Sequence, residues 1–187
     1  MTISASTSKQ MWQILLPEET RTSAYRMVLL GIGNELNGDD AAGVQFVRLL
    51  REILPADSSA APAAHLNTIP TVLLIEGAIA PENSTGSIRK FKPDLVVMVD
   101  AAQMDLQPGQ MTLLDPDLID GITASTHNFP LSMLAGYIRQ EMNCEVRIIG
   151  IQPVGNDQFT PLSAVVETAV QDLVEEFLTH IRRQSHA

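Results

Sequence analysis

The chain has 187 residues, 45% of them apolar and 4% aromatic, which suffices for one compact domain with a sizeable core but not for two ordinary domains. Its formal net charge of -10 opposes binding to nucleic acid, because proteins that bind a phosphate backbone need clustered Lys and Arg. Cys144 is the single cysteine, so the sequence excludes an internal disulfide framework and a cysteine cluster for a structural metal.

The N-terminal segment, residues 1–25, lacks the basic flank and apolar core of a signal peptide. No stretch of the chain approaches the roughly 18 apolar residues that span a bilayer. We therefore expect a cytoplasmic protein without membrane insertion. The segment contains one short apolar patch, Trp12 to Leu16, but no sustained period, so we interpret it as a partly docked extension before a single domain over residues 26–183.

A strand, a loop and a helix are predicted at the start of this domain. The run "MVLLGIG" at 27–33 is apolar and ends in glycines, which is typical of a strand buried on both faces. From Ala41 to Leu54 the apolar residues recur at helical spacing, and Pro55 closes the segment. Residues 55–70 are rich in Ala and Ser and show no period, so they predict a surface connection.

Two further strands are predicted in the middle of the chain. Residues 71–77 and 94–102 are short β-branched apolar runs, and they end in the acids Glu76 and Asp100. Residues 81–90 between them predict a turn and at most a short helix.

Strands and helices also alternate in the C-terminal part of the chain. Residues 109–115 predict a strand at the edge of the sheet, and 131–141 predict a helix with Pro130 in its first turn. Residues 145–153 predict the last strand. Residues 163–183 carry paired apolar residues every four positions, which predicts a long amphipathic closing helix.

Strands that alternate with helices predict the α/β class: three layers, with a mostly parallel twisted sheet between helices on both faces. The carboxyl ends of parallel strands share one edge, and the loops that leave them line the crevice where ligands bind. We expect Glu76, Asp100 and the acids of the loop after the first strand at that edge.

That loop, "GIGNELNGDD" at 31–40, resembles a glycine-rich phosphate turn but differs from it in charge. Leu36 stands where a dinucleotide turn needs its third glycine, and Glu35, Asp39 and Asp40 make the loop acidic. A carboxylate near a phosphate costs on the order of a few kcal/mol at the effective dielectric of a protein surface. Nucleotide binding is therefore disfavoured, and a divalent cation is the better ligand.

The two aspartates also permit a structural interpretation. Aspartates before a helix usually cap it, because a side-chain oxygen accepts an unpaired backbone N–H and the charge suits the dipole. Both roles are compatible if Asp39 caps the helix and Asp40 reaches into the crevice. Asp100 is costly to bury at the end of so apolar a strand unless it is paired or coordinated.

His127 lies in the polar segment "STHNFP", before a predicted helix. A lone loop histidine is more often solvated or hydrogen-bonded than a ligand, and Asn128 beside it is a candidate cap. Together with Asp40 and Asp100, His127 supplies one nitrogen and two carboxylates, which match a divalent ion with open coordination positions. We expect the other histidines to face solvent: His65, His180 and His186.

Other catalytic arrangements have less support. The sequence contains neither a G-x-S-x-G nor an H-E-x-x-H motif. Cys144 has no histidine near it in sequence, so we expect a small buried apolar residue rather than a nucleophile.

Four separated segments resemble, in order and in spacing, those of the nickel-iron hydrogenase maturation endopeptidases. The segment "GAIAPEN" at 77–83 is similar to the hydrogenase 3 branch, which is associated with formate hydrogenlyase. The resemblance runs from about Met27 to about Thr179. One departure is Glu76-Gly77-Ala78 in place of the more usual Asp-Gly-Gly. The four segments are "GIGNELNGDDAAG", "VDAAQM", "STHNFPL" and "GIQP".

The resemblance implies a fold of the hydrogenase maturation protease, or phosphorylase/hydrolase-like, type and a cytoplasmic endopeptidase. Such an enzyme removes the C-terminal extension of a hydrogenase large-subunit precursor after nickel insertion. By position, the family's metal-contacting residues correspond to Asp40, Asp100 and His127. The metal implied is nickel carried by the substrate, with no organic cofactor.

We hypothesise that these three residues complete the coordination of nickel presented by the precursor, and that Asn34, Asp39 and Glu76 orient them. Hydrolysis then has two routes, through polarisation of the carbonyl by the metal or activation of water by a carboxylate. The alternative is a non-hydrolytic, nickel-dependent checkpoint or chaperone that binds the large subunit. We expect a monomer.

Overall fold

A computed structural model of the chain describes residues 8–15, 25–54, 71–117, 119, 130–155 and 157–184. It contains a five-stranded sheet in the order β2-β1-β3-β5-β4. Neighbouring strands are parallel except β4, which pairs antiparallel with β5. The position of β4 at the edge of the sheet agrees with the sequence prediction. The strands are β1 (Arg26–Ile32), β2 (Thr71–Ala78), β3 (Leu95–Ala101), β4 (Met111–Leu114) and β5 (Glu145–Ile151).

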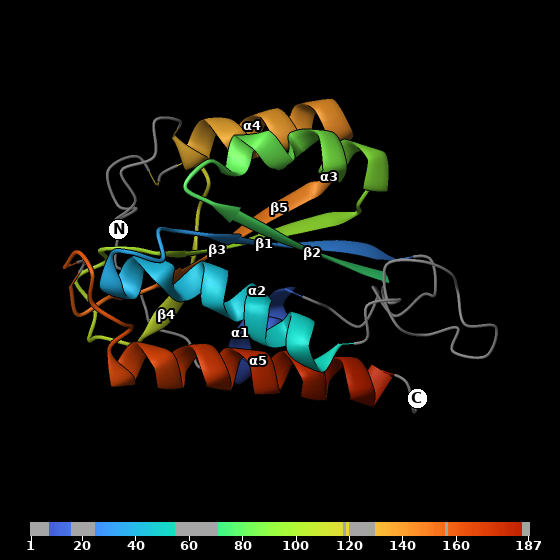
Figure 1. The fold of residues 1–187 in the computed structure, drawn as a ribbon. Helices are drawn as coiled ribbons and strands as arrows, with labels where there is room; N and C mark the ends of the chain where they lie inside the picture. The colour runs from blue at the N-terminus through green and yellow to red at the C-terminus, as the bar shows by residue number, and fades with distance from the viewer. Residues whose placement is uncertain are drawn as a thin grey trace.

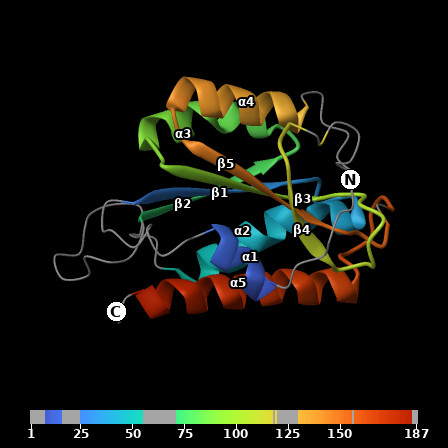
Figure 2. The ribbon, with the colours of Figure 1, turned by 180° about the vertical axis from the view of Figure 1, so that it is seen from behind.

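Helices cover both faces of this sheet, which confirms the three-layer α/β prediction. α3 and α4 lie on one face, and α1, α2 and α5 lie on the other (Figures 1 and 2). None of the described helices is long and apolar enough to cross a lipid bilayer. The predicted connection over residues 55–70 lies outside the described residues. The helices are α1 (Ser8–Leu15), η2 (Gly38–Ala41), α2 (Ala42–Ile53), η4 (Pro81–Ser84), α3 (Thr85–Phe91), α4 (Leu131–Met142) and α5 (Ala164–Gln184).

The sheet separates two apolar cores, one under each layer of helices. Along β1, Met27 and Leu29 pack in the core with α2 and α5, whereas Val28 and Leu30 pack in the core with α3 and α4. All seven residues of β3 are buried. Burial on both faces explains why the central strands are continuous apolar runs in the sequence instead of alternating ones.

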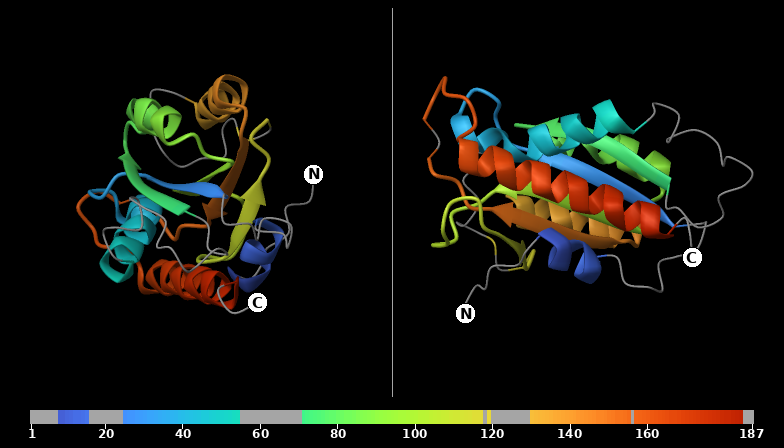
Figure 3. Two further views of the ribbon diagram at one scale, coloured as in Figure 1. Left: turned by 90° about the vertical axis from the view of Figure 1, so that its right-hand side faces the viewer. Right: turned by 90° about the horizontal axis from the view of Figure 1, so that it is seen from below.

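The N-terminal extension contributes a helix, α1, that the sequence does not predict. Its residues Met11, Trp12 and Leu15 are buried in the core of the α2–α5 face. Trp12 Nε1 donates a hydrogen bond to the Leu173 carbonyl at 2.9 Å, and its ring centroid lies 4.7 Å from that of Phe177. Figure 3 shows α1 beside α5. Because α1 has only 8 residues, it is too short to show a sustained helical period.

Two glycines bring the first turn of α2 directly onto the sheet. A Cβ atom on Gly31 of β1 would lie 2.1 Å from the Gly43 carbonyl oxygen. A Cβ atom on Gly43 would lie 1.9 Å from the Val99 carbonyl oxygen of β3. Any side chain at either position would therefore push α2 away from both strands. This close approach places η2, which precedes α2, against β3.

We expect Trp12→Ala to reduce the free energy of unfolding by about 3–5 kcal/mol, because it removes a buried aromatic side chain from the core. Ile14→Ala is the matched control, since Ile14 lies in the same helix but is 57% exposed, and it should change stability by about 0.5 kcal/mol or less. Chemical denaturation of the full chain measures both values. Equal small effects would show that α1 does not stabilise the fold.

Candidate functional site

Two predicted ligand residues lie in contacting elements at the carboxyl edge of the sheet. Asp40 belongs to η2, Asp100 is the penultimate residue of β3, and these two elements pack together. Asp40 is 3% exposed and Asp100 is fully buried. The loops that leave β1 and β5 meet at this same edge, at the left of Figure 1. The edge therefore concentrates acidic groups where they have little contact with water.

The third predicted ligand, His127, lies outside the described residues, as does its neighbour Asn128. Within the part of the chain that the structure describes, no group of three His, Cys, Asp or Glu side chains is arranged to hold a metal ion. The structure thus places two of the three predicted ligands, and the complete set stays a prediction.

The turn after β1 positions Asp40. The backbone N–H of Asn34 donates to Asp40 Oδ2 at 3.0 Å, and Asn34 Oδ1 accepts from the Leu36 N–H at 3.0 Å. Gly33 has a φ of +128°, and a Cβ atom there would lie 1.6 Å from the Asp40 carbonyl oxygen. A glycine is therefore required at position 33, because only glycine combines this backbone angle with so close an approach. Asn34 therefore contacts Asp40 through its backbone N–H. That the Asn34 side chain orients the metal ligands stays a prediction.

Asp39 does not cap its own helix, so the capping interpretation is wrong. Neither η2 nor α2 has a side-chain hydrogen bond at its N-cap. Instead, Asp39 Oδ1 accepts from the Ser163 N–H at 2.7 Å, and Oδ2 accepts from the Val154 N–H at 2.8 Å and from Ser163 Oγ at 2.9 Å. Hydrogen bonds to a carboxylate are stronger than neutral ones. The Asp39 side chain therefore ties η2 to the segment between β5 and α5.

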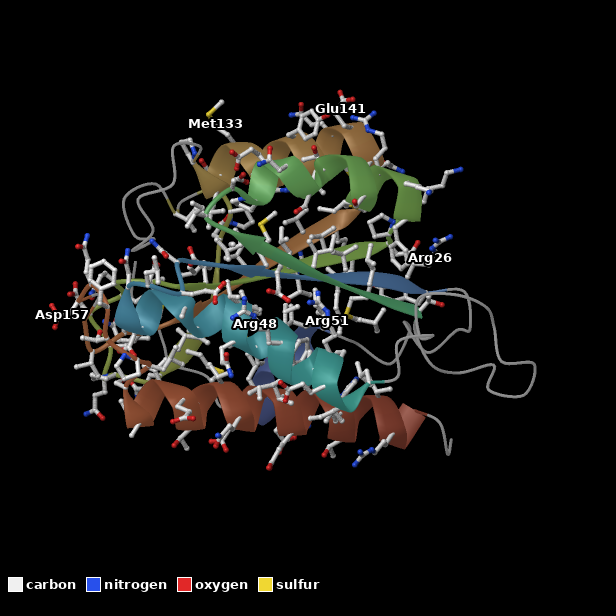
Figure 4. All side chains as sticks on the ribbon, viewed as in Figure 1. Arg26, Arg48, Arg51, Met133, Glu141 and Asp157 are labelled. Atoms are coloured by element: carbon white, nitrogen blue, oxygen red, sulfur yellow. The ribbon has the colours of Figure 1, made fainter. Side chains whose placement is uncertain are left out.

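Glu76 lies near the C-terminal end of β2 and is held by two arginines of α2. Arg48 Nε lies 3.0 Å from Glu76 Oε2, and an Arg51 guanidinium nitrogen pairs with Oε1. Figure 4 shows both arginines on α2 below the sheet. Arg48 also binds both carboxylate oxygens of Glu35, at 2.5 and 2.6 Å. These contacts direct the Glu76 carboxylate toward α2.

The Glu35–Arg48 pair changes the proton affinity of both groups. The hydrogen bonds from Arg48 lower the pKa of Glu35, and the hydrogen bonds from Glu35 raise the pKa of Arg48. Both side chains are well exposed, at 38% for Arg48 and 48% for Glu35, so solvent screening keeps the contribution to stability modest. The pair holds the loop after β1 to the side of α2.

Gln152 organises the loop after β3, although its sequence pattern did not mark it as a site residue. Its side chain is 5% exposed, and Oε1 accepts from the N–H groups of Met104 at 2.8 Å and Leu106 at 3.3 Å. Its Nε2 donates to Gln103 Oε1 at 2.8 Å. These bonds fix the segment that begins just beyond Asp100. Its only sequence signal is its place in "GIQP", because one amide side chain carries no recognisable pattern.

Cys144 is partly buried and packs against the apolar core beneath α4, so its predicted burial is only partly correct. Its Sγ lies 3.9 Å from the Ile138 carbonyl oxygen, and burial raises the pKa of the thiol. A raised pKa keeps the sulfur protonated and unreactive at neutral pH. His180 is partly buried on α5, so its predicted exposure is only partly correct; His65 and His186 lie outside the described residues.

Comparisons with known proteins connect this arrangement to one family. Residues 62–180 match the family model HycI, described as hydrogenase maturation protease. The chain is 32% identical to the hydrogenase 3 maturation protease of Escherichia coli K12 over 149 residues, which cover 79% of this chain and 86% of that relative. It is also 32% identical to a putative hydrogenase maturation protease of Methanocaldococcus jannaschii over 153 residues, which cover 82% and 86% of the two chains.

A solved structure agrees with the sequence comparisons. The crystal structure of the NiFe hydrogenase maturation protease HycI from Thermococcus kodakarensis KOD1 superposes on this chain with a TM-score of 0.75 at 30% identity. The superposition covers 92% of this chain and 99% of that structure. The whole described domain therefore shares this architecture.

Asp39→Asn should lower the free energy of unfolding by about 1–3 kcal/mol, because an amide places a donor against the Val154 or Ser163 donors and leaves a buried group unsatisfied. Asp157→Asn is the matched control, since it makes the same chemical change on an exposed side chain of the same segment. Thermal and chemical denaturation measure both variants. A control as destabilised as Asp39→Asn would contradict the assigned role.

Arg48→Ala should raise the pKa of Glu35 toward its ordinary value, because it removes the hydrogen bonds that stabilise the carboxylate. Since folding lowers this pKa, the pair stabilises the fold above the unfolded pKa, and that stabilisation is lost as the pH falls through the folded one. NMR titration of the Glu35 carboxyl carbon measures the shift. Arg51→Ala, which removes a partner of Glu76, should leave the Glu35 pKa in place; equal shifts in both variants would contradict the assignment.

Proposed function

The chain belongs to the HycI family of hydrogenase maturation proteases, and from this premise we propose that it is an endopeptidase acting on the large-subunit precursor of a nickel-iron hydrogenase. It removes the C-terminal extension of the precursor after nickel insertion. The observation that supports the proposal is the pair of buried carboxylates, Asp40 and Asp100, on contacting elements at the carboxyl edge of the sheet. In a parallel α/β sheet this edge is where ligands bind.

Nickel bound to the precursor is the ligand proposed for this edge. Two carboxylates buried in neighbouring elements repel each other, and a divalent cation between them turns that repulsion into attraction. Carboxylate oxygens and an imidazole nitrogen are ligands that nickel accepts. Asp40 and Asp100, with His127, would leave coordination positions for the precursor's own ligands. A precursor without nickel lacks this contact.

The single thiol of the chain lies toward the opposite edge of the sheet, at the amino ends of the strands. Cys144 precedes β5, whose first residue, Glu145, pairs with Leu95 at the start of β3, whereas Asp100 lies near the end of β3. Cys144 therefore sits toward the amino edge, away from Asp40 and Asp100. A site built on carboxylates, with no thiolate of its own, suits a metal that arrives with the substrate better than one held permanently.

Each side chain has a part in the proposed reaction. Asp40 and Asp100 hold the nickel-loaded precursor in register, so recognition and positioning of the peptide bond are one event. Either carboxylate is a candidate general base for the attacking water, and nickel is a candidate to polarise the carbonyl. Asp39 contributes by holding η2 in place through Val154 and Ser163.

Asp40→Asn and Asp100→Asn should each slow cleavage of the nickel-loaded precursor by about a hundredfold or more, because an amide is a weaker ligand and no base. Asp105→Asn is the control: it lies on an exposed loop just beyond β3, and asparagine tolerates its φ of +57°. Mass spectrometry of the incubated precursor measures loss of the extension, and circular dichroism checks folding.

Full processing of the precursor by both Asp40→Asn and Asp100→Asn would contradict the role proposed for these two carboxylates. Wild-type protein should leave nickel-free precursor uncut. A wild-type protein that binds nickel-loaded precursor but never changes its mass would instead identify a non-hydrolytic checkpoint or chaperone.

A further inference from the structure

Three exposed apolar side chains lie on the two loops that join at the carboxyl edge. Leu36, in the turn after β1, is 58% exposed; Val154 and Phe159, between β5 and α5, are 59% and 80% exposed. We call these three residues the Phe159 patch. Figure 4 labels Asp157 in the second loop, at the end of the molecule where the carboxyl ends of the strands lie. Exposed apolar side chains that gather on one surface mark interaction sites.

The two loops are joined by backbone contacts, so the patch is held as a unit. The N–H of Phe159 donates to the Leu36 carbonyl at 2.5 Å. Gly38 packs so closely on the second loop that a Cβ atom there would lie 2.7 Å from Thr160 Oγ1. Hydrogen bonds between the loops limit their motion, and a surface that is already ordered loses less entropy on binding.

Phe159 adopts a backbone conformation that is unfavourable for its side chain. Its φ is +61°, in the left-handed region that glycine and asparagine adopt more readily. The side chain is almost fully exposed, so burial in this chain does not offset the cost. Residues with strained backbone angles are concentrated at functional sites. Large aromatic side chains are among the residues that supply much of the binding energy at interfaces.

The patch is continuous with the proposed site. The N–H of Val154 donates to Asp39, the residue next to Asp40, and Leu36 lies in the turn that positions Asp40. A partner that covers the patch therefore also reaches the edge that holds Asp40 and Asp100. Neither loop, over residues 34–40 or 152–163, contains Lys, Arg or His. Glu35 is paired with Arg48 of α2, so the exposed negative charge beside the patch is that of Asp157. The charge suits a partner whose apolar contact is bordered by basic residues.

We propose that the Phe159 patch docks the hydrogenase large-subunit precursor, through an apolar segment of the precursor flanked by Lys or Arg. This inference rests on the proposed function and adds a second contact, separate from the nickel. The patch holds the body of the precursor while Asp40 and Asp100 engage its metal. Binding energy from residues remote from the peptide bond then positions the substrate.

The test compares a patch variant with a matched control of other exposed apolar residues. Leu36→Ser/Val154→Thr/Phe159→Asn removes the apolar surface, and asparagine suits the φ of position 159. The control, Ile14→Ser/Ile53→Thr, alters side chains that are 57% and 50% exposed on α1 and at the C-terminal end of α2. Binding to nickel-loaded precursor from the same organism is measured by biolayer interferometry, and cleavage by mass spectrometry.

The patch variant should raise the Kd and the KM by at least about tenfold and keep kcat within about twofold of wild type, while the control matches wild type. Added salt should weaken binding of the wild type. A patch variant that binds as tightly as the control overturns the proposal. The proposal is also overturned if the wild type sediments as a dimer and the patch variant sediments as a monomer. The patch would then bind a second copy of the chain.

Two results separate this inference from the proposed function. If the wild type never cleaves the precursor, the endopeptidase proposal is wrong. The binding measurement alone still tests whether the Phe159 patch docks the precursor. If the wild type cleaves the precursor and the patch variant cleaves it with the same KM, the docking proposal is wrong and the endopeptidase proposal is unaffected. If the triple variant unfolds, the single variant Phe159→Asn is compared with the wild type instead, because it changes only the most exposed of the three residues.

Discussion

The direct contact of α2 with β1 and β3 is the constraint on which the carboxyl edge depends. Because Gly31 and Gly43 have no side chains, the first turn of the helix lies against the backbone of both strands. This contact brings η2 against β3, and with it Asp40 into the element that packs on the strand bearing Asp100. A helix farther from the sheet would not bring η2 against β3. The contact between the two elements that carry these acids thus depends on the absence of two Cβ atoms.

Long-range hydrogen bonds then hold the loops of this edge. Asp39 accepts bonds from Val154 and Ser163, and Gln152 fixes the segment after β3. Since each anchor joins segments far apart in the chain, the loops are ordered by the completed fold and not by local turns. An ordered edge fixes Asp40 and Asp100 in advance, which under the proposed function reduces the entropy lost when the precursor binds.

The acids that the sequence assigns to this edge have different partners in the structure. Asp39 binds the chain's own N–H and hydroxyl groups, and Glu76 binds arginines of α2. Asp40 and Asp100 are buried where η2 meets the end of β3. The sequence cannot separate these roles, because Asp39 and Asp40 are neighbours of the same residue type. They differ only in the direction of the side chain and in the groups that the fold brings to it.

The sequence alone determined the class of the fold, the strands, most of the helices, the edge position of β4 and the family, because hydrophobic periodicity and turn residues are local signals. Four short motifs in order also singled out Asp40 and Asp100, and the structure places both in contacting elements at the carboxyl edge, while their role in the reaction stays a prediction. Only the tertiary structure decided that α1 completes the core through Trp12, that Asp39 joins two loops, and that Gln152 supports the edge. Each of these depends on a contact between distant segments, which no local pattern of residues records.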